Sequence, residues 1–366
     1  MKDITKVKEK MEKFMAKFDN MPDRLMKYVE ILLLGKDASP WAYQQKPSFR
    51  RISVNPTTRC NLNCVWCQRQ ESVIKPTLNK DLDFKKFKKI VSQLKGFKKV
   101  HIGGNGEFLL YSKLPELIAL CRKYVPEVIL TTNLTLLTPE MTRRLAKAGL
   151  TYLEASIDGF EKGKQQRYRG LGIAEIDKIL PNLKYFSDHT SIPVQINSVV
   201  SDFNIKSLYP AIDKLKDIKN LVCMHTIKLF MTDFLKKQGI KGVTKEQHRN
   251  LLLHWQKRAQ KLGLKKLKFS PDLAGVELDS VITMKEKHNI CFVPFEDPTI
   301  DCEGYLVPCG RMYNVKLDNV FKLGFEGAWN GPRSRQFRQN MLTGKYPIWC
   351  ELECNLKSRI KNEKKI

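Results

Sequence analysis

The pattern of apolar positions changes its period near residue 51 and divides the chain into two kinds of segment. Before that point, apolar residues recur at helical spacing over 7–18 and again over 25–32, where Gly35 ends the pattern. These stripes predict two amphipathic helices whose apolar faces pack against the rest of the chain. We therefore expect a helical N-terminal extension over residues 1–50.

After residue 51, short apolar runs alternate with helical patterns, of which the pattern from Phe84 to Leu94 is the clearest. The runs predict six strands, at 51–55, 100–103, 128–132, 152–157, 194–200 and 221–230. Strands and helices that alternate at this spacing form parallel sheets with crossover helices, and ligands bind at the carboxyl ends of the strands. The pattern therefore predicts one large α/β domain over residues 51–285.

Three cysteines, Cys60, Cys64 and Cys67, lie within eight residues directly after the first predicted strand. A closed structural zinc or iron–sulfur site normally takes four protein ligands, whereas a site that carries out chemistry keeps one position open. Half of a zinc site, or a few buried thiols, is the alternative interpretation. The spacing Cys-x3-Cys-x2-Cys, with Trp66 before the last Cys, resembles the cluster loop of the radical S-adenosylmethionine (radical SAM) enzymes.

In the radical SAM family, three such Cys hold a [4Fe–4S] cluster and S-adenosylmethionine (SAM) chelates its fourth iron. The resemblance therefore implies that these three Cys bind a [4Fe–4S] cluster and that SAM is a cofactor. It also implies a partial (β/α)6 TIM-like barrel, which agrees with the six predicted strands.

The loops after the second and third predicted strands resemble two further segments of the family. Gly104, Gly106 and Glu107 match its Gly-rich segment, in which a carboxylate balances the SAM ammonium group and glycines let the backbone approach the ligand. Asn133 matches the family's Thr-Asn-Gly turn, although Leu134 stands where the family has Gly. A Leu at positive φ would be strained, so the local backbone at this turn is an open question.

The fourth and fifth predicted strands also carry polar residues that the resemblance assigns to the SAM pocket. Ser156, Asp158 and Arg169 resemble the family's Ser-x-Asp-Gly segment and the Arg-Gly that follows it. A helix N-cap or turn residue is the alternative interpretation of Asp158. Gln195 and Asn197 share one strand face and need hydrogen-bonding partners in an apolar barrel, and we expect Asn197 to bind the SAM ribose.

A second group of cysteines near the end of the chain resembles a SPASM or twitch domain, which carries auxiliary [4Fe–4S] clusters. Because the stretch 310–349 contains no Cys, we predict one auxiliary cluster within a small Cys-rich domain over 286–366. Its predicted ligands are Cys291, Cys309, Cys350 and Cys354. Cys302 is a possible alternative ligand, and a structural zinc site with the same four thiolates is the alternative interpretation.

Two cysteines remain outside these groups. Cys121 follows a helical apolar stripe and is expected to be an inert core thiol. Cys223 lies in the last predicted strand, where a thiol facing the barrel could donate a hydrogen atom to a substrate radical, although packing is the simpler interpretation.

The composition indicates a cytoplasmic protein with a strong positive field. The 366 residues include 65 Lys and Arg against 38 Asp and Glu, a formal charge of +27. Such a field attracts anionic small molecules and acidic proteins, including an electron donor such as flavodoxin or ferredoxin, but dispersed Lys-rich helix faces explain the charge equally well. The aliphatic run 31–34 is too short to insert into a membrane, and we find no motif for nucleic-acid binding.

The resemblance implies that the chain reductively cleaves SAM to a 5′-deoxyadenosyl radical, which abstracts hydrogen from a substrate. Four Cys ligands on the auxiliary cluster favour electron transfer, and hence an oxidative outcome such as dehydrogenation. The expected substrate is small, polar and anionic: a sugar, cyclitol or nucleotide-linked carbohydrate. Maturation of a ribosomally synthesised peptide, by cross-linking or epimerisation, and a non-enzymatic basic iron–sulfur protein that binds nucleic acid are the alternative hypotheses.

Overall fold

The computed structural model describes residues 51–70, 78–161, 169–170, 173–229, 233–271, 293–310 and 312–342, together with 345, 347 and 350. The predicted N-terminal extension over 1–50 lies outside the described residues. Two of the predicted auxiliary-cluster ligands, Cys291 and Cys354, lie outside them as well.

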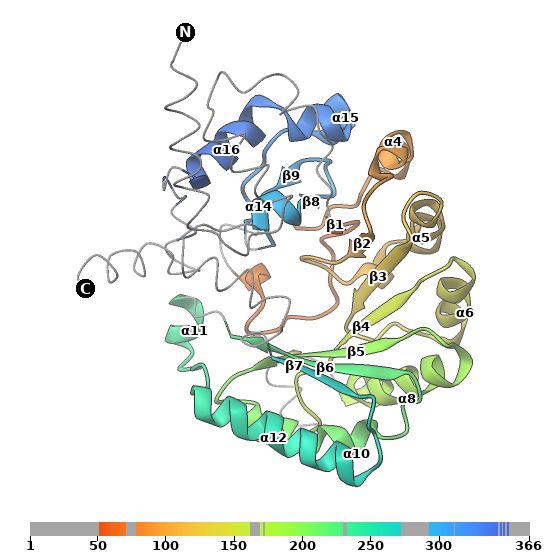
Figure 1. Cartoon of the computed structure of the whole chain (residues 1–366), viewed down its shortest axis with the longest axis vertical. Helices are drawn as coiled ribbons and strands as arrows, with labels where there is room; N and C mark the ends of the chain where they lie inside the picture. The colour runs from red at the N-terminus through yellow and green to blue at the C-terminus, as the bar shows by residue number, and fades with distance from the viewer. Residues whose placement is uncertain are drawn as a thin grey trace, which may run out of the picture.

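A nine-stranded sheet in the order β7-β6-β5-β4-β3-β2-β1-β8-β9 organises the described chain, and β1 to β7 are parallel neighbours (Figure 1). Its first seven strands are β1 (Arg51–Val54), β2 (Lys99–Ile102), β3 (Glu127–Thr132), β4 (Tyr152–Ser156), β5 (Val194–Val200), β6 (Leu221–Lys228) and β7 (Lys268–Pro271). The six predicted strands and their parallel arrangement are confirmed. β7 was not predicted, because Lys-Phe-Ser-Pro carries too little apolar pattern to mark a strand.

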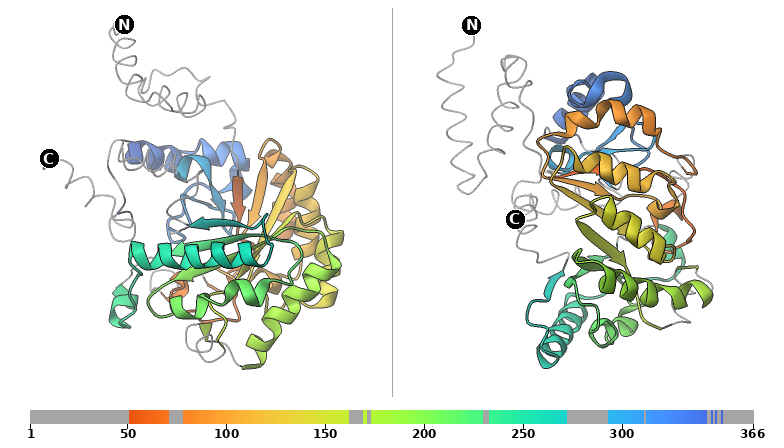
Figure 2. Two further views of the ribbon diagram at one scale, coloured as in Figure 1. Left: turned by 60° about the horizontal axis from the view of Figure 1, so that its bottom comes forward. Right: turned by 90° about the vertical axis from the view of Figure 1, so that its right-hand side faces the viewer.

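Helices cover the outer face of this sheet, and its other face is turned toward the interior of the barrel (Figures 1 and 2). They are α4 (Phe84–Ile90), α5 (Leu114–Arg122), α6 (Pro139–Lys147), α8 (Ile173–His189), α9 (Ile205–Leu208), α10 (Ala211–Leu215), α11 (Asp233–Lys237) and α12 (Lys245–Lys261), with short 3-10 turns η2 (Gln68–Gln70), η4 (Val91–Leu94) and η5 (Phe108–Leu110). The strand residues that point outward, such as Ile52, Val100 and Leu130, are fully buried against these helices. The curved sheet with its outer helices is the predicted partial barrel.

Local sequence signals explain where several of these helices begin. The Asp83 side chain accepts a hydrogen bond from the backbone of the first turn of α4, and Thr138 does the same for α6, where Pro139 occupies the first turn. Thr244 and Gln247 form a reciprocal capping box at the start of α12. These caps satisfy backbone donors that the helix itself leaves unpaired.

The C-terminal region continues the same sheet instead of starting a separate one. It contains α14 (Val293–Glu296), β8 (Thr299–Ile300), β9 (Leu306–Val307), α15 (Val320–Trp329) and α16 (Pro332–Leu342). β8 pairs in parallel with β1, and β9 pairs with β8 in antiparallel orientation. α15 also packs on α4 and η4, where the rings of Phe97 and Phe325 meet edge to face at 5.3 Å between centroids. The domain boundary between 285 and 286 therefore stays a prediction.

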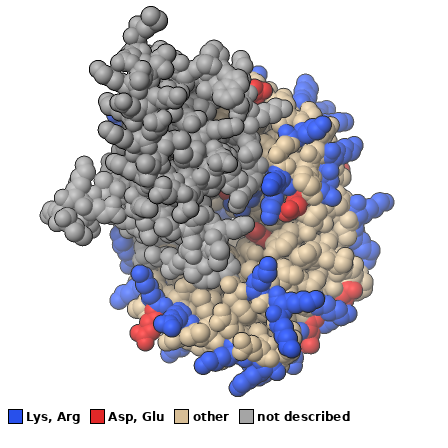
Figure 3. Space-filling model, viewed as in Figure 1, with Lys and Arg blue, Asp and Glu red and all other residues tan. Residues whose placement is uncertain are grey.

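The surface agrees with a dispersed positive charge. Lys and Arg side chains are spread over the face shown in Figure 3 and do not gather in one patch there. Within the described ranges, no helix combines the length and the apolar character needed to cross a membrane.

Candidate active site

The loop after β1 carries the three cysteines of the first group. Cys60, Cys64 and Cys67 are all half-buried and free of disulfides. The backbone N–H of Cys67 donates to the carbonyl of Cys64 at 3.0 Å, and that of Leu62 donates to the Cys60 sulfur at 3.4 Å. Burial raises the pKa of the Cys60 thiol and raises that of Cys64 to about 12. Burial thus disfavours the thiolate forms of Cys60 and Cys64, and a positive metal centre would favour them.

The donor set of this loop fits an open [4Fe–4S] cluster. Three soft sulfur donors come from one short loop at the carboxyl end of a barrel strand, which leaves the fourth iron to another ligand. In the part of the chain that is described, no three His, Cys, Asp or Glu side chains converge as ligands of a single metal ion do. A cube needs no such convergence, because each thiolate binds a different iron.

The Gly-rich loop after β2 packs directly on the cluster loop. A Cβ atom on Gly106 would lie 2.2 Å from the carbonyl oxygen of Thr57, so only glycine fits there. Next to it, the backbone N–H of Glu107 donates to the carbonyl of Arg59 at 2.8 Å. We expected the glycines to let the backbone come close to a ligand. At Gly106, the backbone instead comes close to the backbone of Thr57. This contact fixes the position of the cluster loop relative to β2.

Glu107 is a buried junction between two loops. Its carboxylate accepts hydrogen bonds from the Leu109 N–H at 3.2 Å, the Thr132 hydroxyl at 2.8 Å and the Asn133 N–H at 2.7 Å. Burial raises the pKa of Glu107, although these hydrogen bonds oppose the shift. A carboxylate offers about four acceptor positions, so three donors leave about one for a further partner such as an ammonium group. Its predicted role toward SAM stays a prediction.

The turn after β3 connects to the cluster loop through paired amides. Asn133 donates from its side chain to the Asn61 side chain at 3.1 Å, and Asn61 donates in turn to the Thr135 hydroxyl at 2.8 Å. Leu134 has φ +69°, in the left-handed region that favours Gly, and its side chain is fully buried. The turn therefore keeps its shape at the cost of backbone strain.

Asp158 and Arg169 form a buried ion pair beside the same loop. Asp158 accepts from the Arg169 guanidinium at 2.8 and 2.9 Å and from the Val199 N–H at 2.8 Å. The carbonyl of Arg169 accepts from the N–H of Asn63, within the cluster loop, at 3.1 Å. The pair thus holds the segment after β4 against the cluster loop, which is a supporting role that the sequence did not reveal.

Polar side chains line the inner side of the barrel one layer below the strand ends. They come from five adjacent strands: Ser53, His101, Thr131, Tyr152, Glu154, Gln195 and Asn197. We call this set the polar floor. Strand register and the two-residue period place these side chains on the face opposite the outward apolar residues. Sequence reasoning found only Gln195 and Asn197, because it examined strand ends and not the positions two residues before them.

One hydrogen-bonded chain runs through the polar floor. Ser53 lies 3.4 Å from His101 Nδ1, and His101 Nε2 lies 2.8 Å from the Thr131 hydroxyl. Thr131 donates to Glu154 at 2.8 Å, and Asn197 donates to the same carboxylate at 3.1 Å. Burial alone would raise the pKa of Glu154, but the adjacent His101, the hydrogen bonds and the charge of Arg51 outweigh it and lower the pKa to about 2. The floor therefore contains a fixed anion.

The remaining barrel residues of the prediction also face this interior. Ser156 ends β4 in register with Asn197, whose amide accepts from Gln195 at 2.7 Å. Cys223 is in register with Gln195 on β6 and is buried. This register places the thiol beside the floor. The roles predicted for Ser156 and Asn197 toward SAM, and for Cys223 as a hydrogen donor, stay predictions.

The cysteines outside the first loop have distinct surroundings. Cys121 is a fully buried core thiol, as predicted, and burial raises its pKa to about 12. Cys309 is half-buried, whereas Cys302 and Cys350 are buried. The Gln68 side chain, one residue after the cluster loop, donates to the carbonyl of Gly310 at 2.9 Å, so the loops that bear Cys67 and Cys309 touch.

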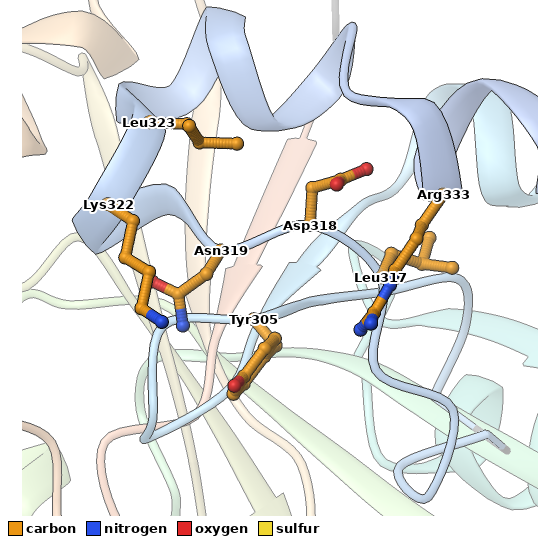
Figure 4. Close-up of a pocket in the computed structure, with 7 residues that line it drawn as sticks. All are labelled: Tyr305, Leu317, Asp318, Asn319, Lys322, Leu323 and Arg333. Atoms are coloured by element: carbon orange, nitrogen blue, oxygen red, sulfur yellow. The ribbon is translucent and has the colours of Figure 1, made fainter.

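A groove of about 350 Å³ lies apart from these residues, on the C-terminal region. Its lining is Tyr305, Leu317, Asp318, Asn319, Lys322, Leu323 and Arg333 (Figure 4). The Asp318 carboxylate accepts from the Ser334 N–H at 2.8 Å at the start of α16, and Asn319 caps α15. The groove thus lies at the joint between two helices, and no residue at the ends of the barrel strands lines it.

Comparison with known proteins agrees with this site. The family model of the Radical SAM superfamily matches residues 54–215, and that of the SPASM iron–sulfur cluster-binding domain matches 291–355. The chain is 30% identical over 166 residues to Fe-coproporphyrin III synthase of Methanosarcina barkeri, covering 45% of this chain and 40% of that protein. It is 28% identical over 190 residues to GTP 3′,8-cyclase of Clostridium botulinum, covering 50% and 56%. The chain thus spans about half the length of the curated relatives it matches.

A third relative and a solved structure extend the comparison. PqqA peptide cyclase of Bradyrhizobium diazoefficiens is 31% identical over 158 residues, covering 42% of this chain and 39% of that protein. SuiB of Streptococcus suis, solved with bound SAM, superposes with a TM-score of 0.62 at 18% identity, covering 90% of this chain and 78% of that one. At this identity, the likeness to SuiB shows the fold alone.

Proposed function

Because the chain belongs to the radical SAM superfamily and carries a SPASM domain, we propose that it dehydrogenates a small, polar, anionic substrate such as a sugar, cyclitol or nucleotide-linked carbohydrate. The two domains confirm the predicted cofactors: a [4Fe–4S] cluster with SAM, and an auxiliary iron–sulfur cluster. Bound SAM supplies a 5′-deoxyadenosyl radical, which abstracts hydrogen. The chain itself supplies binding, orientation and proton acceptance.

The polar floor is the observation that carries this proposal. Side chains from five strands expose hydroxyl, imidazole, carboxylate and amide groups toward the barrel interior. These groups bond to one another, but each hydrogen-bonding position that this leaves open would cost about 1–3 kcal/mol if an apolar substrate covered it. A hydroxylated substrate forms direct hydrogen bonds at these positions, in place of the water that it displaces. The floor therefore favours a polar substrate over an apolar one.

His101 is the candidate proton acceptor in this proposal. Dehydrogenation of a CH–OH group removes one hydrogen atom, one proton and one electron. The imidazole of His101 lies between Ser53 and Thr131, and its Nε2 is 3.5 Å from the Glu154 carboxylate. Because Thr131 donates its hydroxyl hydrogen to Glu154, the Nε2 atom carries the ring hydrogen, and Nδ1, which faces Ser53, is the atom that accepts a proton. The auxiliary cluster, with Cys291, Cys309, Cys350 and Cys354 as proposed ligands, would supply the electron acceptor.

The charge distribution orients the proposed substrate. Glu154, with its pKa of about 2, is an anion at the floor and repels an anionic group placed beside it. The formal charge of +27 attracts the same group to the protein as a whole. We therefore place the hydroxyl-bearing end of the substrate at the floor and its anionic end toward the barrel mouth. An acidic flavodoxin or ferredoxin is the proposed electron donor, and the reducing cytoplasm is the proposed compartment.

Peptide maturation is the competing proposal, supported by the partial similarity to a peptide cyclase. A peptide also presents hydrogen-bonding groups to a polar floor, so the floor alone does not separate the two substrates. Since the chain is a radical SAM enzyme, the hypothesis of a non-enzymatic nucleic-acid-binding protein is set aside.

The experiment that tests the proposal measures 5′-deoxyadenosine released by the reduced, cluster-loaded enzyme. The probe is a small-molecule filtrate from a lysate of the source organism. Anion exchange divides it into a bound fraction and a flow-through. We expect the bound fraction to accelerate the release of 5′-deoxyadenosine by about tenfold, because a bound substrate commits SAM to cleavage. Acceleration only by the flow-through would refute an anionic substrate. Acceleration only by the peptides that the filter holds back, assayed separately, would favour maturation.

A further inference from the structure

Asn55 is the buried amide at the carboxyl end of β1. It directly follows the strand, its backbone N–H donates to the Ile300 carbonyl at 2.9 Å, and the residue has no exposed surface. Both polar atoms of its side chain, Nδ2 and Oδ1, are buried without a hydrogen-bond partner. The two-residue period puts this side chain on the same face as Ser53, which belongs to the polar floor.

A second buried asparagine shows how this fold treats an amide that serves structure. Asn204 also has no exposed surface. Its Nδ2 donates to the carbonyls of Asp158 at 2.8 Å and Val199 at 2.6 Å, and its Oδ1 accepts from the Ser201 N–H at 2.8 Å. Buried amides are normally paired in this way, because an unpaired one costs stability. The amide of Asn55 therefore needs a different explanation.

The surroundings of Asn55 place it where the barrel meets the C-terminal region. A Cβ atom on Gly104 would lie 3.1 Å from Asn55 Cγ and 2.4 Å from the hydroxyl of Tyr313. The amide and the phenol thus border the same small space, and any side chain at Gly104 would fill it. Tyr313 is buried and follows β9 in the sequence, so this space is shared by the barrel and the C-terminal region.

We propose that the Asn55 amide binds a hydroxyl group of the substrate, at a position that Tyr313 borders from the C-terminal region. A hydroxyl both donates and accepts, so it can satisfy Oδ1 and Nδ2 together. A carboxylate satisfies only the donor, and an ammonium group satisfies only the acceptor. This inference rests on the proposed function and deepens it, since it extends the polar floor upward to the strand end and makes Asn55 a specificity-determining residue for a hydroxylated substrate.

SAM is the other ligand that could reach this amide, and the position of Asn55 argues against it. The residues predicted for the SAM pocket continue from Gly104 along β3, β4 and β5, through Asn133, Ser156 and Asn197. Asn55 lies at the opposite side of Gly104, beside β8. A group that pairs with Asn55 therefore comes from a molecule between the barrel and the C-terminal region.

The test replaces each buried asparagine by the similarly sized leucine in the cluster-loaded protein under anaerobic conditions. Asn55→Leu removes an amide that has no partner, so we expect the melting temperature without substrate to rise by about 2–4 °C. Asn204→Leu, the matched control, breaks several hydrogen bonds and should lower it. We further expect the SAM dissociation constant of Asn55→Leu to stay within about twofold of wild type.

Each outcome decides the proposal without knowledge of the substrate. A lower melting temperature for Asn55→Leu would mean that the amide is satisfied structurally and would overturn the inference. A SAM affinity weakened about tenfold would assign the amide to SAM and overturn it as well. Where the small-molecule filtrate accelerates SAM cleavage by wild type, Asn55→Leu should lose that acceleration, and Tyr313→Phe should reduce it while remaining folded. A filtrate without effect on wild type would contradict the proposed function, while the melting and SAM measurements still decide the role of Asn55.

Discussion

The buried ion pair between Asp158 and Arg169 offers a quantitative test of how the cluster loop is supported. Asp158→Asn keeps an acceptor for the Val199 N–H but leaves the guanidinium without its counter-ion, and Arg169→Met leaves the carboxylate without its own. The side chains are only 4% and 2% exposed, so each single substitution should cost about 3–5 kcal/mol. The double variant buries no unpaired charge.

We therefore expect a coupling energy of at least about 2 kcal/mol, with the double variant less unstable than the sum of the single variants. Urea unfolding of the anaerobic holoenzyme measures the stability, and iron content reports on the cluster loop, because the Arg169 carbonyl holds the Asn63 N–H. The exposed pair of Asp213 and Arg258 is the matched control, and the same substitutions there should shift the urea midpoint little. Additive costs at the buried pair would refute the reasoning.

Three further predictions concern the clusters, SAM and pH. Reconstituted protein should hold about eight irons, and replacing Cys60, Cys64 and Cys67 together by Ala should halve that number, whereas an unchanged iron content would remove them as ligands. Glu107→Gln should weaken SAM binding in calorimetry and lower thermal stability, because the amide repels one of the three donors that now meet the carboxylate; unchanged values of both would contradict its junction role. Burial raises the pKa of Asp301 to about 6, so ionisation at higher pH costs about 3 kcal/mol relative to an unfolded pKa of 3.8. Asp301→Asn should therefore raise the urea midpoint at pH near 8 and lose that gain below a pH of about 4, and an equal gain at both would be inconsistent with this assignment.

Periodicity and spacing predicted the parts of this structure that depend on neighbouring residues. The six strands, the Cys loop after β1 and the buried thiol of Cys121 follow from local pattern alone. The strained conformation of Leu134 was recognisable too, since a bulky residue occupied a position typical of Gly.

Contacts between distant loops could not be read in the same way. Glu107 bonds to the turn after β3, and Asp158 bonds to Arg169 and Val199, because the folded sheet brings their loops to one edge. In the sequence, a carboxylate beside glycines such as Glu107 is as compatible with binding a ligand as with bonding to another loop. Sequence alone therefore does not reveal these structural partners. The polar floor did leave a signal: His101 and Glu154 interrupt apolar strands at positions that share a face with the strand ends.

The mass of the product tests the central claim most directly. Enzyme supplied with SAM, reductant and the active filtrate fraction in deuterated buffer should yield a product two mass units lighter than its substrate, once the positions beside the new carbonyl group have been exchanged back in ordinary water. Cys350→Ala should abolish that product while 5′-deoxyadenosine still forms. A product of unchanged mass apart from one deuterium taken from solvent, lost in Cys223→Ala, would show that hydrogen returns to the substrate radical and would contradict dehydrogenation.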